Sequence, residues 1–145
     1  MSKIQLVALD LDGTLFNHDG MITEKTKNEI KRITNKGIHV VISTGRPYNG
    51  VPFSQIKDTG IDYAITTNGA AIYRISTNEC LYENCIDFTL VEPILTFLLE
   101  KRIHIDLYIN GKGFTPRYCR ENLHKLDVPP SLKKYILATR TPVDD

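Results

Sequence analysis

Short apolar runs alternate with amphipathic segments along the first half of the chain. The first run, over residues 4–9, is almost continuously hydrophobic, which predicts a buried parallel strand. Thr23 is a good helix N-cap and Gly37 a good helix stop, so the segment between them predicts a helix. The complete set of expected elements is strands at 4–9, 38–42 and 63–65, with helices at 24–36 and 52–59. This alternation predicts an α/β fold, a Rossmann-like doubly wound parallel sheet.

Beyond residue 70 the pattern changes to paired strands and separate helices. Asn110-Gly111-Lys112-Gly113 between two apolar runs is a hairpin signal. One face of the segment 89–101 carries only apolar side chains, as in an amphipathic helix: Leu90, Ile94, Phe97 and Leu98. The expected elements are hairpins at 71–75/80–86 and 104–109/114–118, helices at 89–101 and 120–126, and a last strand at 135–138. This α+β character predicts two domains, 1–82 and 83–145.

Each of the first three strands runs into a polar turn that contains glycine. The turns are Asp10–Gly13, Ser43–Pro47 and Thr66–Gly69. Right-handed crossovers place the carboxyl ends of parallel strands at one edge of the sheet, where open α/β sheets bind their ligands. We therefore expect the three turns to meet and form a site.

Asp10 and Asp12 are the strongest candidates for chemistry in this site. They are two residues apart, so an extended backbone turns both carboxylates the same way, while Leu11 points back into the core. One carboxylate can attack an electrophile such as phosphorus, and the other can carry protons. Both are hard oxygen ligands suited to Mg²⁺. The alternative is structural, because aspartates often end a strand and begin a turn.

The second and third turns supply candidate phosphate ligands. The Thr44 hydroxyl could donate to a phosphate oxygen, or could simply stabilise its turn. Arg46 is either an anion clamp or a surface arginine, and the sequence does not decide between them. Asn68 and Gly69 either contact the bound ligand or form the turn that leads into the next segment.

Composition excludes several classes of function. The 145 residues carry 18 basic and 17 acidic side chains, so no bulk field attracts nucleic acid or an anionic membrane. The first apolar run ends at Asp10, too early for a signal peptide or a membrane span. Three scattered cysteines fit reduced thiols in the cytoplasm, and the four histidines have no metal-ligand spacing. No GxxxxGK string occurs, which argues against a P-loop hydrolase. Oligomeric state is left open.

Three strings together resemble a known family. DLDGTL at 10–15, STGRP at 43–47 and TTNGA at 66–70 are similar to motifs of the haloacid dehalogenase superfamily, and most of all to its Cof-type sugar-phosphate phosphatases. The resemblance implies that Asp10 is the nucleophile and a Mg²⁺ ligand. It implies that Asp12 is the acid/base, with its main-chain carbonyl on the metal. The backbone of Leu11, with Thr44 and Gly45, would hold the phosphate of a small metabolite.

The second half of the chain resembles the start of the family's α+β cap, which selects the substrate. The family's later motifs, a lysine and a GDxxND-like acidic loop, have no counterpart after Ala138. The resemblance therefore implies the N-terminal part of a phosphatase, with an incomplete core and weak or absent hydrolysis on its own. Two alternatives are a receiver-like module phosphorylated on Asp10 and a catalytically dead binding scaffold. Receivers carry their acceptor on a later strand, which argues against the first alternative.

Overall fold

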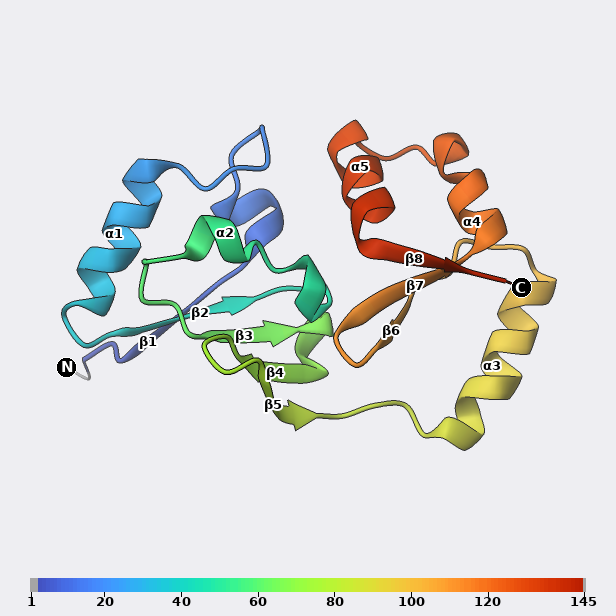
Figure 1. Ribbon diagram of the computed structural model, residues 1–145, viewed down its shortest axis with the longest axis horizontal. Coiled ribbons are helices and arrows are strands. Elements are labelled where there is room, and N and C mark those ends of the chain that lie inside the picture. The colour runs from blue at the N-terminus through green and yellow to red at the C-terminus, as the bar shows by residue number, and fades with distance from the viewer. Residues whose placement is uncertain (1–2, 145) are drawn as a thin grey trace. The chain divides into compact units, whose positions relative to one another are not determined.

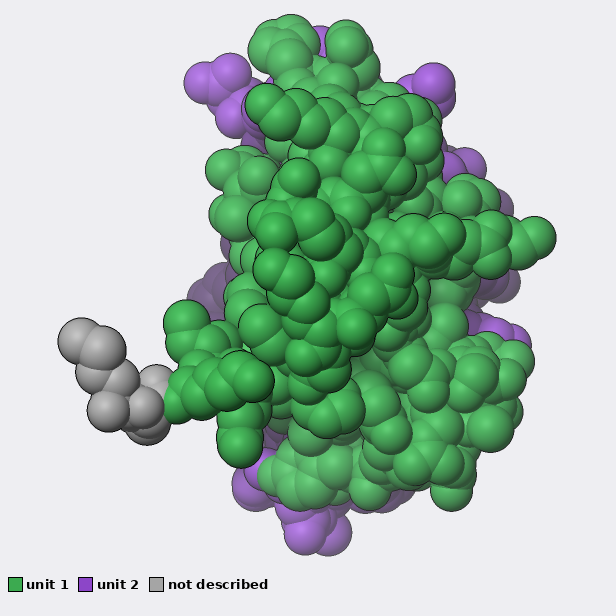
Figure 2. All heavy atoms as spheres, turned by 90° about the vertical axis from the view of Figure 1, so that its left-hand side faces the viewer, with its two compact units in different colours: residues 1–83 green, residues 84–145 purple. Residues whose placement is uncertain are grey.

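A computed structural model describes residues 3–144 of the chain. It forms two compact units, residues 1–83 and residues 84–145, coloured separately in Figure 2. Each unit has its own sheet, so each is described by itself.

The first unit is built on one five-stranded sheet in the order β1-β2-β3-β4-β5 (Figure 1). The first three strands are parallel, and the last two extend the same sheet as an antiparallel hairpin. The strands are β1 (Leu6–Leu9), β2 (His39–Ser43), β3 (Tyr63–Thr66), β4 (Ala71–Arg74) and β5 (Glu79–Glu83). The α/β class and the parallel core expected from the sequence are confirmed.

Two crossover helices connect the parallel strands, α1 (Glu24–Thr34) and α2 (Phe53–Ile56). The Thr23 hydroxyl accepts a hydrogen bond from Thr26 N at 3.2 Å, so the expected N-cap is correct. Buried side chains of both helices share one core with β2 and with the wide helical turn η1 (Leu11–Leu15). That core places α1 and α2 on the same face of the sheet, as Figure 1 shows.

The first strand is less buried than its sequence predicts. It pairs in parallel with β2, as expected, with Leu6 opposite His39 and Leu9 opposite Ile42. Ile4 is nevertheless 67% exposed and Leu6 is 55% exposed. The reason is its place in the sheet, because within residues 3–144 β1 is an edge strand with a neighbour on one side only. Hydrophobic character alone does not reveal that position.

The second unit contains a three-stranded sheet in the order β6-β7-β8 and three α-helices among its described residues. The strands β6 and β7 form the expected antiparallel hairpin, and β8 pairs in parallel with β7. The elements are α3 (Phe88–Glu100), β6 (Leu107–Ile109), β7 (Lys112–Pro116), α4 (Arg117–Glu121), η4 (Leu123–Lys125), α5 (Pro130–Thr139) and β8 (Arg140–Val143).

Two expectations for this unit, the strand at 135–138 and the start of the helix near Arg120, are corrected by the structure. The strand expected at 135–138 is wrong, because these residues lie within α5, which begins with Pro130 at a position that suits proline. The helix expected from Arg120 begins at Arg117, since β7 ends at Pro116. The apolar face of α3 is not buried, and Phe97 is 56% exposed.

Candidate active site

The three polar turns of the first unit meet, as the sequence predicts. Asp12 in the first turn forms an ion pair with Arg46 in the second, with Nη2 and Oδ1 2.6 Å apart. The second turn bonds the third through its backbone, because Thr67 N donates to Arg46 O at 2.9 Å and Asn68 N donates to Thr44 O at 3.3 Å. The turns therefore form one connected structure at the carboxyl ends of β1, β2 and β3.

The first turn presents Asp10 to solvent and buries the residue that follows it. Leu11 is fully buried in the core, as expected from the alternation. Backbone bonds from Leu15 N to Asp10 O and from Phe16 N to Leu11 O close the turn at 3.2 and 3.0 Å. Gly13 has φ = 77°, a left-handed conformation that glycine adopts without strain. The chain can therefore reverse within a few residues while the Asp10 carboxylate stays open.

The second and third turns approach each other closely at Gly45. A Cβ atom at this position would lie 2.8 Å from Asn68 Oδ1, so glycine lets the two turns approach without displacing the end of the Asn68 side chain. Asn68 has φ = 55°, a left-handed conformation that asparagine tolerates better than most residues. Thr44 is 5% exposed, and its hydroxyl oxygen accepts a bond from Arg46 N at 3.2 Å. The side chains expected to bind phosphate thus come from two interlocked turns.

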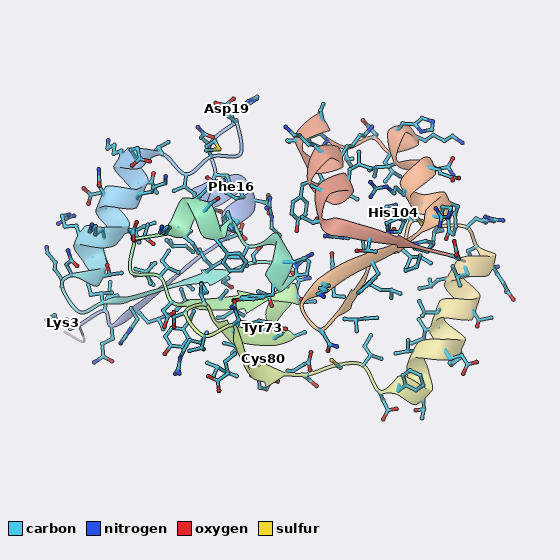
Figure 3. All side chains as sticks on the ribbon, in the orientation of Figure 1. Lys3, Phe16, Asp19, Tyr73, Cys80 and His104 are labelled. Atoms are coloured by element: carbon cyan, nitrogen blue, oxygen red, sulfur yellow. The ribbon has the colours of Figure 1, made fainter. Side chains whose placement is uncertain are left out.

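Arg46 has a partner that sequence reasoning missed. Its Nε donates to Asp12 Oδ2 at 2.8 Å, and its Nη2 donates to Oδ1 at 2.6 Å. Its Nη1 donates to Gly50 O at 3.2 Å, and the guanidinium lies 4.9 Å from the ring centroid of Phe16, labelled in Figure 3. The two partners are 34 residues apart, so no local pattern could have shown the pair.

The acidic side chains of this site fit Mg²⁺ in their chemistry. Mg²⁺ takes hard oxygen ligands and often uses only one or two protein carboxylates. The Asp10 carboxylate has one side-chain hydrogen bond among the described contacts, from Thr14 Oγ1 at 3.5 Å. Residues 3–144 contain no cluster of three or more His, Cys, Asp or Glu side chains able to hold a metal. The Asp10 carboxylate therefore remains the expected side-chain ligand of a cation, and the main-chain carbonyl of Asp12 remains the second expected ligand.

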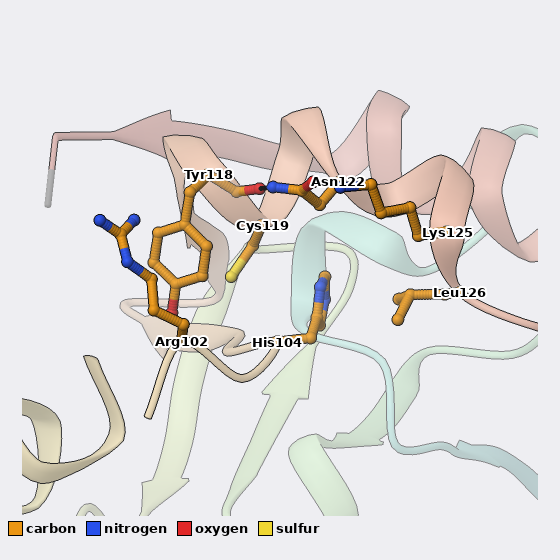
Figure 4. A pocket seen from close by; sticks show the side chains of 7 residues that line it. All are labelled: Arg102, His104, Tyr118, Cys119, Asn122, Lys125 and Leu126. Atoms are coloured by element: carbon orange, nitrogen blue, oxygen red, sulfur yellow. Dashed lines mark hydrogen bonds between the residues drawn. The ribbon is translucent and has the colours of Figure 1, made fainter. Parts of the chain in front are cut away.

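The second unit has a pocket of its own that the sequence did not predict (Figure 4). It measures about 350 Å³, and its lining includes Arg102, His104, Tyr118, Cys119, Asn122 and Lys125. Several of these side chains bond to nearby atoms of the same unit. Tyr118 OH donates to Ile103 O at 2.8 Å, and Asn122 Nδ2 donates to Tyr118 O at 2.8 Å. These bonds hold the local backbone, so the candidate reaction centre remains at the turns of the first unit.

A family model matches most of the chain. Residues 7–140 match the model described as haloacid dehalogenase-like hydrolase. The chain belongs to this family. The resemblance of its three turn motifs is thereby confirmed.

In the part that the structure describes, no helix has the length and apolar character needed to cross a membrane.

Curated relatives are phosphatases by name. The chain is 42% identical over 110 residues to a putative phosphatase of Buchnera aphidicola, covering 75% of this chain and 41% of that protein. It is 30% identical over 126 residues to the 5-amino-6-(5-phospho-D-ribitylamino)uracil phosphatase YwtE of Bacillus subtilis, covering 86% of this chain and 43% of that protein. The chain therefore spans less than half the length of these relatives.

Solved structures share the fold over nearly the whole chain. A haloacid dehalogenase-like hydrolase from B. subtilis superposes with a TM-score of 0.79 at 25% identity, over 97% of this chain and 54% of that one. The subclass IIB sugar phosphatase BT4131 superposes with a TM-score of 0.73 at 22% identity, over 97% of this chain and 52% of that one. The second likeness establishes the fold alone.

Proposed function

We propose that the turns of the first unit form the reaction centre of a Mg²⁺-dependent phosphomonoester hydrolase, with Asp10 as nucleophile. The observation that supports this most is the connection of three strand-end turns around Asp10 and Asp12. Asp10 is exposed at the end of β1, and Asp12 is exposed beside it in η1. Family membership supports the same reaction class.

In the proposed reaction an Asp10 oxygen attacks the phosphorus of a phosphate monoester. The bond from phosphorus to the leaving oxygen breaks, and Asp12 gives that oxygen a proton, so an alcohol leaves and Asp10 holds an acyl phosphate. Water then attacks the same phosphorus while Asp12 takes up a proton, which releases inorganic phosphate and restores both carboxyl groups. A Mg²⁺ ion bound beside Asp10 would offset the repulsion between the carboxylate and the phosphate oxygens.

The phosphate would be held by both side chains and backbone. Thr44 accepts a bond from Arg46 N, which leaves its hydroxyl proton available to a phosphate oxygen. The backbone of Leu11 and of Gly45, with Asn68 and Gly69, forms the remaining proposed binding surface. A Cβ atom at Gly69 would meet no atom within 4 Å, so a ligand can approach this backbone.

The proposed substrates are sugar phosphates or similar small phosphorylated metabolites in the cytoplasm. The named substrate of YwtE is a phosphorylated ribityl compound, and BT4131 is named as a sugar phosphatase. Both names describe those proteins, and they support a small polyol or sugar phosphate for this chain.

Binding of beryllofluoride, a phosphoryl analogue, tests the proposal without requiring turnover. We expect a ¹⁹F NMR signal of bound beryllofluoride that needs Mg²⁺ and is lost in Asp10→Asn. The matched control is Asp19→Asn, an exposed aspartate at the tip of the loop after η1 (Figure 3), which should bind normally. Absence of a Mg²⁺-dependent signal from the wild-type chain, or its persistence in Asp10→Asn, would overturn the proposal.

Hydrolysis of p-nitrophenyl phosphate is a second measurement on the same variants. Turnover by this chain alone is expected to be weak, but Asp19→Asn should match whatever rate the wild type shows and Asp10→Asn should abolish it, because Asp10 is the group proposed to form the acyl phosphate. An Asp10→Asn variant as active as the wild type would show that another group attacks phosphorus.

A further inference from the structure

We propose that Arg46 is a positioning residue that orients the Asp12 carboxylate for proton transfer, and that it is not a clamp for the substrate phosphate. This inference rests on the proposed function, since it assigns a task to Asp12 in that reaction. Three observations carry it: the two-bond shape of the ion pair, the anchoring of the arginine and the exposure of the two side chains.

The ion pair has the two-bond geometry that fixes a carboxylate plane. Arg46 Nε and Nη2 each donate to a different oxygen of Asp12, at 2.8 and 2.6 Å. A guanidinium is planar and rigid, so two parallel bonds define the orientation of the carboxylate as well as its distance. A lysine ammonium at the same place would supply charge without this orientation.

Arg46 is also held by contacts that do not involve Asp12. Nη1 donates to Gly50 O at 3.2 Å, and the Phe16 ring centroid lies 4.9 Å from the guanidinium carbon. Its backbone is bonded on both sides, through N to the Thr44 hydroxyl and through O from Thr67 N. The arginine is thus fixed by the second and third turns, and it transmits that position to the first.

Exposure shows which member of the pair is available for chemistry. The Asp12 side chain is 57% exposed, whereas the Arg46 side chain is 16% exposed. A substrate can therefore reach the carboxylate more easily than the guanidinium. This asymmetry favours a supporting task for Arg46 and a reacting task for Asp12.

Substitution of Arg46 separates positioning from phosphate binding. We expect Arg46→Met to bind beryllofluoride within about twofold of the wild type, because the phosphate-binding surface is intact. We expect kcat/KM to fall roughly 10- to 100-fold for an alkyl phosphate such as glucose 6-phosphate, as part of the ~10²–10⁴ that general acid–base catalysis contributes. The fall for p-nitrophenyl phosphate should stay below about threefold, since nitrophenolate leaves without a proton.

Three further measurements complement this test, and the last of them needs neither turnover nor a variant of Arg46. Arg46→Lys retains the charge and should show the same dependence on leaving group. Added guanidinium chloride at millimolar concentration should partly restore alkyl phosphate hydrolysis by Arg46→Met. In the wild-type chain the Arg46 Nε–H should exchange slowly with solvent by NMR, and Asp12→Asn should accelerate that exchange.

The outcomes separate this inference from the proposed function. A tenfold or larger loss of beryllofluoride binding in Arg46→Met would make Arg46 a phosphate clamp and overturn the inference. Equal losses for both substrates, or rapid Nε–H exchange in the wild type, would overturn it as well. Failure of the wild-type chain to bind beryllofluoride would instead reject the proposed function, and this inference with it.

Discussion

Each unit of this protein contains an arginine–aspartate pair 34 residues apart in sequence, and the two pairs differ in burial. In the first unit the side chains of Arg46 and Asp12 are 16% and 57% exposed. In the second unit those of Arg140 and Asp106 are 4% and 19% exposed, with Nε and Oδ2 2.8 Å apart. The first unit therefore has an arginine–aspartate pair whose carboxylate is exposed to solvent, whereas both side chains of the pair in the second unit are mostly buried.

The enclosed pair is surrounded by groups of its own unit. Arg140 Nη2 donates to Tyr108 OH at 2.8 Å, and its Nη1 donates to Thr139 Oγ1 at 2.9 Å. The rings of Tyr108 and Tyr135 lie 4.9 and 5.3 Å from the guanidinium carbon. Burial by itself lowers the pKa of Arg140, but its bonds with Tyr135 and Asp106 outweigh burial and raise it. The guanidinium therefore stays charged and joins several side chains of this unit.

The difference indicates how to distinguish a structural ion pair from a functional one. A pair whose two members are both enclosed contributes to the fold, because removing one charge leaves the other buried without compensation. A pair whose carboxylate is open contributes little to stability, so its geometry is available for another purpose. By this criterion Arg140 stabilises the second unit, whereas Arg46 fits the positioning task that we propose for it.

The largest expected effect is on the stability of the second unit. Arg140→Met should destabilise that unit by about 3–5 kcal/mol, because it removes the guanidinium that pairs with the mostly buried Asp106 carboxylate. Arg46→Met should cost only about 0.5–1 kcal/mol in the first unit. Amide hydrogen exchange in β7 and in β2 measures the two opening free energies separately. Similar losses in both units would invalidate the comparison.

A smaller loss of stability is expected when a glycine beside each ion pair is replaced by alanine. Gly113 lies against Arg140 in the second unit, and Gly45 lies in the same turn as Arg46 in the first. A Cβ at Gly113 would lie 2.5 Å from Arg140 Cδ, so Gly113→Ala should cost about 1–3 kcal/mol by overpacking. A Cβ at Gly45 would meet only the end of the Asn68 side chain, at 2.8 Å, so Gly45→Ala should cost about 1 kcal/mol or less. Urea unfolding compares both variants with Lys112→Ala, an exposed neighbour of Gly113. A larger loss for Gly45→Ala would contradict the expected order.

The smallest expected effect is a loss of folding stability at alkaline pH through Tyr108, which accepts a hydrogen bond from Arg140. Burial raises the pKa of Tyr108 above its ordinary value of 10.0, and the nearby Arg140 charge does not offset this. The neutral phenol therefore stabilises the fold fully below pH 10, and this contribution is lost as the pH rises through the raised pKa. Tyr108→Phe should lose less stability than the wild type between pH 9 and about pH 11, measured by urea unfolding with far-ultraviolet circular dichroism. A steeper alkaline loss in the variant would show that burial does not control this tyrosine.

Local sequence signals predicted the elements that depend on local physics. The Thr23 cap, the parallel pairing of β1 with β2 and the hairpin around Asn110 and Gly111 all follow from nearby residues. The prediction that β1 is buried was wrong, because the exposure of a strand depends on which strands lie beside it in the sheet. The strand expected at 135–138 was also wrong, because Pro130 starts a helix that continues through those residues.

The sequence predicted where the candidate site lies, but it did not predict the contacts between its turns. The convergence of three turns follows from the handedness of crossovers, and the structure confirms it. The roles of Asp10 and of the phosphate ligands remain predictions. The partner of Arg46 could not be found from sequence, because contacts between distant turns depend on tertiary geometry rather than on local pattern.

The outer edge of β1 has a practical consequence. This strand ends next to Asp10, the proposed nucleophile, yet the apolar side chains of Leu6 within it and of Ile4 just before it are more than half exposed. An uncovered edge with such side chains is a template on which another extended polypeptide can add, including a second molecule in concentrated solution. Preparations of the isolated chain should therefore aggregate through β1, and Leu6→Lys would be the first substitution to try for solubility.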